Sequence, residues 1–194
     1  MGPTAAMDEP NGASECAPEE RTLFRARAGD TGAFAELVRA HQGSVFSLAL
    51  RLLGAREESQ ELAQDVFLQL HRNLARIESA RHLYFWLRRT VSHRAIDRLR
   101  HRAREPFDPV EDVPEIETPH LHADPMLERR LRESVTALPP VARAVVLLRY
   151  QEDLDPTEIA SILDLSINTV KSHLKRSLAL LRWRCRELQE GESS

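Results

Sequence analysis

One segment divides the sequence into two parts. Residues 105–125 hold five prolines and seven acidic residues, with no lysine or arginine. Proline interrupts helices and strand pairing, and a segment this acidic lacks the apolar residues that could offset the entropy of ordering. It predicts an extended linker between two folding units, each of them small.

Both sides of this linker are typical of helical proteins. The chain is 42% hydrophobic but only 5% aromatic, Leu, Ala, Arg and Glu predominate, and alternating runs of β-branched residues are scarce. We therefore predict an all-α fold of two small helical domains, at residues 21–104 and 126–188.

The two ends of the chain are expected to be tails. Residues 1–20 hold five acids, three prolines and no lysine or arginine, which predicts a disordered acidic tail. Residues 189–194 form a short tail at the other end.

The first domain shows three stretches with apolar residues at helical spacing. One amphipathic helix is expected between the breaks at Gly29 and Gly54, a second at about 57–73 and a third at about 83–104. Three or four such helices can share one small core.

The second domain ends in a predicted helix-turn-helix. Asp155 can cap a helix that has Glu158 at its third position, Asp164 and Leu165 make the turn, and Ser166 can cap the next helix. Ala160 and Val170 are the small and apolar residues that a close crossing of the two helices needs.

The helix after this turn is basic. Residues 167–186 hold six lysines and arginines and no acid, which favours contact with phosphates. The first turns of a recognition helix reach base edges in the major groove. We expect base readers at Asn168, Thr169, Lys171, Ser172 and Lys175, with Arg176 on a phosphate.

The last helix of the first domain is also basic, with nine arginines against two acids in residues 76–104. Aromatic residues lie near its start, and aromatics beside cations suit the binding of unpaired bases and their backbone. The arginines of this set are expected to be exposed and to contact phosphates, and at least one aromatic is expected in the core. The candidate residues are Tyr84, Trp86, Arg88, His93, Arg94, Asp97, Arg98 and Arg100. His93 and Asp97, one turn apart, are expected to form a local pair.

Four segments, ELAQDVFLQLHRNL, FWLRRTVSHRAIDRLR, LPPVARAVVLLRY and EIASILDLSINTVKSHLKRSL, together resemble the extracytoplasmic-function branch of the sigma factor family. The resemblance covers nearly all of residues 21–188. It implies that the first domain is sigma region 2, which docks on the β′ clamp helices of core RNA polymerase and melts the start-proximal promoter element. It implies that the second is region 4, which reads the minus-thirty-five element and touches the β flap.

The resemblance also assigns residues and partners. By motif position, Glu61, Gln64, Asp65 and Leu68 fall on the polymerase-docking helix; without the resemblance, the acids there would indicate a solvated face. An anti-sigma factor is the implied regulatory partner, and the linker would occupy the path of the transcript. The chain departs from the family at His93, where Asn is frequent, and at Asp155-Pro156, where Ser-Tyr is more usual. We expect both departures to affect which promoter sequence the chain recognises, and not its function.

Other classes of function are less consistent with the sequence. HExxH spacing and a glycine-rich phosphate loop are lacking, and Cys16 and Cys185 form no metal-binding cluster, so we expect no catalysis, metal or cofactor. The sequence has no apolar run near 18 residues and no signal peptide pattern. We therefore expect a cytoplasmic location and no insertion into a membrane.

The remaining alternative is a transcriptional regulator with a LuxR-like output domain, because the helix-turn-helix fits that class nearly as well. The helical first domain, basic at one end, argues against it.

Overall fold

The computed structural model of the chain describes residues 18–103 and 125–190. At positions 125, 127, 128 and 185–190 it describes the backbone but not the side chains. The expected tails at 1–17 and 191–194 and nearly all of the expected linker, residues 104–124, lie outside the described residues. Within the described ranges the structure is helical and holds no strand. This confirms the all-α fold class.

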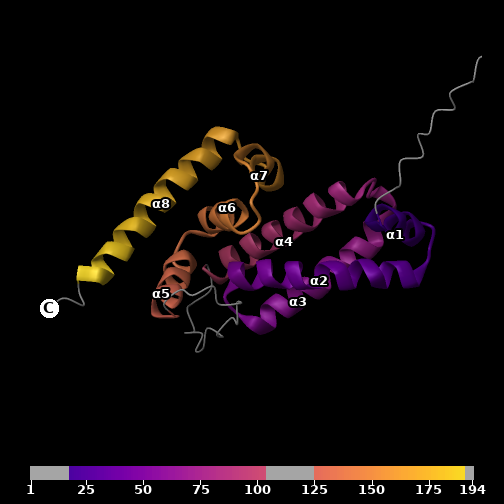
Figure 1. Cartoon of the computed structure of the whole chain (residues 1–194), viewed down its shortest axis with the longest axis horizontal. Helices are drawn as coiled ribbons and strands as arrows, with labels where there is room; N and C mark the ends of the chain where they lie inside the picture. The colour runs from indigo at the N-terminus through magenta and orange to yellow at the C-terminus, as the bar shows by residue number, and fades with distance from the viewer. Residues whose placement is uncertain (1–17, 104–124, 191–194) are drawn as a thin grey trace, which may run out of the picture.

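Eight α-helices and one 3-10 helix make up the described part of the chain (Figure 1). They are α1 Pro18–Arg27, α2 Thr31–Leu53, α3 Arg56–Asn73, η1 Leu74–Arg76, α4 Ala80–Arg102, α5 Pro125–Thr136, α6 Pro140–Tyr150, α7 Pro156–Leu163 and α8 Ile167–Glu190.

Local capping sets several helix ends. The Asp30 carboxylate accepts a hydrogen bond from the Ala33 N–H at the start of α2, and the Ser79 hydroxyl accepts one from His82 at the start of α4. Gly54 ends α2 in the left-handed region, at φ 75°, which a residue with a side chain adopts at a cost.

Helix α1 begins at Pro18, inside the segment that we expected to be a tail. Glu20 accepts a hydrogen bond from the Ala80 N–H at 2.8 Å, and Glu19 lies 2.7 Å from His41. Leu23 and Ala26 are buried. The acids that favoured disorder therefore hold α1 against α2 and the start of α4.

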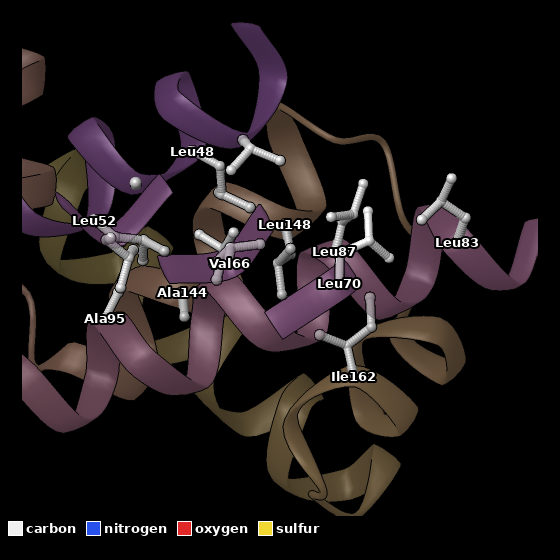
Figure 2. Close-up of a cluster of buried hydrophobic side chains, with 14 of the residues drawn as sticks. Leu48, Leu52, Val66, Leu70, Leu83, Leu87, Ala95, Ala144, Leu148 and Ile162 are labelled. Carbon is white, nitrogen blue, oxygen red and sulfur yellow. The ribbon is translucent and has the colours of Figure 1, made fainter. Parts of the chain in front are cut away.

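The two halves of the chain share one hydrophobic core. Ala144 and Leu148 of α6 and Ile162 of α7 lie among leucines of α2, α3 and α4, such as Leu87 (Figure 2). In Figure 1, α6 and α7 lie against one side of α4, while α2 and α3 lie against the other. The sequence predicted two domains but not that they pack together.

A buried arginine ties these halves together. Arg143 of α6 is 7% exposed, and its guanidinium donates to the backbone carbonyls of Leu52, Thr136 and Leu138. Burial lowers the pKa of Arg143, and nearby Arg102 lowers it further. Because Leu52 is in the last turn of α2, the cation lies at the negative end of that helix dipole.

Candidate nucleic-acid and polymerase interfaces

The helix-turn-helix forms as the sequence predicts. The Asp155 side chain accepts from the N–H groups of Thr157 and Glu158, and Glu158 accepts in return from the Asp155 N–H. Asp164 ends α7 at φ 54°, and the Ser166 hydroxyl accepts from the Thr169 N–H at 3.1 Å. Ala160 and Val170 are both buried at the crossing of α7 and α8.

The start of α8 presents an open polar face. Five of the six expected DNA-contacting side chains there are exposed, namely Asn168, Lys171, Ser172, Lys175 and Arg176. The sixth, Thr169, is half-buried, with its hydroxyl 2.8 Å from that of Ser166. A hollow of about 320 Å³ lies between Asn168, Ser172 and Arg176 and leaves room for part of a bound ligand.

The candidate residues of α4 do not share one face. Tyr84, Arg88 and His93 point toward α6 and α7, whereas Arg94 and Arg98 point toward α3. The others are Trp86, half-buried against the core, and Asp97 and Arg100, both exposed.

Two expectations about α4 side chains are wrong. Arg88 is 7% exposed rather than open to solvent, because Glu152 lies 2.7 Å from its guanidinium. His93 does not pair with Asp97: its Nε2 lies 2.9 Å from the Ile162 carbonyl oxygen, while Asp97 is 3.9 Å from Arg100. In both cases the second domain supplies a partner that local spacing cannot reveal.

The acidic face of α3 is paired with α4. Asp65 lies 3.2 Å from Arg94 and 3.1 Å from Arg98, Glu61 lies 3.8 Å from Arg98, and Glu58 contacts Arg102. These acids are still open to solvent, since the side chains of Glu61 and Asp65 are 72% and 43% exposed.

The other two residues assigned to polymerase docking continue the same stripe of α3, because positions 61, 64, 65 and 68 have helical spacing. Gln64 and Leu68 line an open groove of about 1150 Å³ between α2 and α3, and Leu68 is 58% exposed. Phe34, Phe46 and Phe67 make much of the groove wall apolar. The four assigned residues thus form one stripe of α3, in which Glu61 and Asp65 contact α4 and Gln64 and Leu68 line the groove.

The sequence did not indicate that Arg89, Glu152 and Asp164 interact across the two domains. Arg89 lies 2.5 Å from Asp164 and donates to the Ser161 carbonyl oxygen at 2.8 Å. The only signal in the sequence is opposite charge, which does not identify a partner more than 60 residues away.

In residues 18–103 and 125–190, no cluster of His, Cys, Asp and Glu side chains could hold a metal ion. No helix in the same ranges is long and apolar enough to cross a membrane.

Two protein families match the chain. The family described as Sigma-70 region 2 matches residues 37–105, and that described as Sigma-70, region 4 matches residues 128–181. The first match includes α3 and α4, and the second includes the helix-turn-helix.

Two curated relatives match this chain over most of their own length. The RNA polymerase sigma-E factor of Streptomyces coelicolor is 33% identical over 157 residues, covering 79% of this chain and 86% of that protein. The ECF RNA polymerase sigma factor SigW of Bacillus subtilis is 25% identical over 186 residues, covering 87% of this chain and 97% of that protein.

Solved structures share the fold. The sigma factor RpoE of Bartonella quintana, solved with the anti-sigma factor NepR, has a TM-score of 0.65 at 19% identity, covering 79% of this chain and 96% of that one. CnrH, solved with the cytosolic domain of CnrY, has a TM-score of 0.63 at 22% identity, with 87% and 97% covered. With both domains matched in order, the chain belongs to the sigma-70 family of RNA polymerase sigma factors, in its extracytoplasmic-function branch.

Proposed function

We propose that this chain binds core RNA polymerase in the cytoplasm and directs it to promoters, reading duplex DNA with α8 and holding melted DNA with α4. No bond is made or broken by the chain itself. It contributes binding energy that offsets the unstacking of bases, which costs a few kcal/mol for each flipped base.

The capped, exposed start of α8 carries this proposal. Lys171 and Lys175 project from its first turns, and Ser172 and Asn168 offer short hydrogen-bonding groups between them. This is the arrangement in which a recognition helix contacts base edges while neighbouring cations contact phosphates.

The groove between α2 and α3 supports docking on the β′ clamp helices. It is open and mostly apolar, with Leu68 exposed on one side and Gln64 beside it. An apolar groove between helices suits an amphipathic helix of a partner. The same surface would suit an anti-sigma factor, the regulatory partner that we propose.

A second apolar hollow supports contact with the β flap. It measures about 270 Å³ and lies among α5, α6 and α8, with Leu131, Tyr150 and Leu178 in its wall. Tyr150 is 57% exposed and Leu131 is 45% exposed. Exposed apolar residues that gather around a hollow are typical of partner sites.

Run-off transcription with sigma-free core polymerase, on promoter fragments from the chain's own genome, tests the proposal. We expect start-specific transcripts, and we expect Lys171→Ala with Lys175→Ala to weaken duplex promoter binding by about 1–3 kcal/mol. The control is Arg129→Ala, an exposed cation of the same domain that lies on α5 rather than on α8. DNA binding without any initiation would favour a regulator instead.

A further inference from the structure

The hollow among α5, α6 and α8 has a positively charged side. The end of α2 lies beside α5 and α6 (Figure 1), and Arg51 of α2 lines the hollow together with Arg132 of α5. Six aliphatic side chains of the second domain make up most of the remaining wall, namely Leu131, Val135, Val146, Leu147, Leu178 and Leu181. Two cations therefore lie beside an apolar interior.

Arg51 has hydrogen-bond donors that nothing in the described part of the chain accepts. Its side chain is half-buried, and its guanidinium forms no hydrogen bond or ion pair with any described residue. Glu152 attracts it, but the Glu152 carboxylate lies 2.7 Å from the guanidinium of Arg88. Donors that lose water without gaining an acceptor are costly. A bound anion would supply the missing acceptor.

The charges around Arg51 favour an anion for a second reason. Burial lowers the pKa of Arg51, the charge of Glu152 opposes this, and the charge of nearby Arg132 lowers the pKa further. Two like charges this close repel each other across a wall that is mostly apolar. An anion beside both guanidinium groups would relieve that repulsion.

The volume of the hollow limits the size of the anion. It measures about 270 Å³. At about 30 Å³ for each water, this is the room of about nine waters, or of a chain of about nine non-hydrogen atoms. Planar guanidinium donors match a carboxylate, and an alkyl chain of this length would bury its surface against the leucines and valines.

We propose that this hollow binds a medium-chain fatty acid, whose carboxylate pairs with Arg51 and whose alkyl chain lies among the aliphatic side chains of α5, α6 and α8. Binding itself does not depend on what the chain does. Its consequence rests on the proposed function: because contact with the β flap is proposed for the same hollow, the fatty acid and the flap would exclude each other.

Isothermal titration calorimetry of the full chain with octanoate tests the site. Acetate has the head group without the chain, octan-1-ol has the chain without the charge, and octylammonium carries the opposite charge. We expect octanoate to bind and the other three to bind at least about tenfold more weakly, because charge-assisted hydrogen bonds and apolar burial both contribute. Equal affinity for octanoate and octan-1-ol would overturn the role of Arg51.

Arg51→Met removes the charge and keeps an unbranched side chain. Because the cation is half-buried and unpaired, this variant should have a Tm no lower than that of the wild type, while its affinity for octanoate falls at least about tenfold. Arg39→Met makes the same change at an exposed position of α2 outside the hollow, and it should bind octanoate as the wild type does. Unchanged affinity in Arg51→Met would place the ligand elsewhere, and the inference would be wrong.

A photoreactive octanoate with a diazirine in its chain locates the ligand on the wild-type chain. Mass spectrometry should find the label on α5, α6 or α8, and unlabelled octanoate should displace it. Labelling confined to the larger groove of α2 and α3 would overturn the inference.

Run-off transcription separates this inference from the proposed function. Octanoate should lower transcription by the wild type and have much less effect on transcription by Arg51→Met. A wild type that supports transcription but does not bind octanoate would overturn the inference alone. A wild type that binds octanoate but yields no start-specific transcript would contradict the proposed function alone.

Discussion

At the scale of single residues, Arg143 shows how a buried cation can be held without an acid. Three backbone carbonyls accept its hydrogen bonds, and Nε has no partner among the described residues. Burying a charge is costly unless it is well hydrogen-bonded. The guanidinium instead satisfies carbonyl groups at two helix ends, those of Leu52 in α2 and Thr136 in α5.

Arg143→Met should therefore lower the free energy of unfolding by about 2 kcal/mol, since the carbonyls lose their donors while burial of the charge is relieved. Arg143→Lys, which keeps the charge but reaches fewer carbonyls, should be intermediate. Urea denaturation followed by circular dichroism measures both. A methionine variant within about 0.5 kcal/mol of the wild type would contradict this role.

Leu68 is the residue on which docking in the groove of α2 and α3 can be tested. Leu68→Glu should weaken binding to core polymerase by about 2 kcal/mol, or about thirtyfold, because it places a charge in an apolar contact. Phe24→Glu is a matched control, since Phe24 is 72% exposed on α1 and lies outside the groove. Equal loss in both variants, measured by biolayer interferometry, would argue against docking in the groove.

At the scale of elements, the helices followed closely from the sequence because their ends are capped locally. Gly54 and Asp155 each act on backbone groups within four residues, so residue types alone indicated where α2 ends and α7 begins. The start of α4 was expected at about 83, but the Ser79 cap places it at Ala80. Helix α1 was missed because its support from Ala80 and His41 comes from other helices.

The cap of α7 predicts a dependence on pH. Hydrogen bonds from the N–H groups of Glu158 and Thr157 lower the pKa of Asp155 below its value in the unfolded chain. The carboxylate thus stabilises α7 at neutral pH, and this stabilisation is lost as pH falls below about 4.

Asp155→Asn should keep the cap but not titrate, because an amide oxygen accepts the same hydrogen bonds. Thermal unfolding at pH 7 and pH 3 should show a smaller acid-induced loss for this variant than for the wild type. Asp153→Asn removes the same charge two residues away without touching a cap, and it should behave as the wild type does. An identical acid-induced loss in all three chains would refute the assignment.

At the scale of the whole molecule, the sequence predicted two domains but not their closure. The contacts that close them, such as Arg143 to Leu52 and Arg88 to Glu152, join residues 91 and 64 positions apart. Periodicity and capping act over a few residues and carry no information about such pairs. For the same reason the open face of α8 was predicted well and the covered face of α4 was not.

The shared core predicts one cooperative unfolding transition rather than two. Leu148 and Ile162 are buried in the same cluster as Leu52 and Leu87, so neither domain can unfold without exposing apolar surface of the other (Figure 2). Differential scanning calorimetry should give a single peak with calorimetric and van't Hoff enthalpies about equal. Two resolved peaks would mean that each domain keeps its own core.

Asp164 has a consequence for how such a chain can change in evolution. Its backbone lies in the left-handed region, which Gly, Asn and Asp adopt most readily, but of these three only Asp carries the charge that meets Arg89. A single nucleotide change converts an Asp codon into one for Gly or Asn, and the turn would survive either replacement. Either replacement would thus remove an ion pair between the two domains in one mutational step, with the sequence of α8 unaltered.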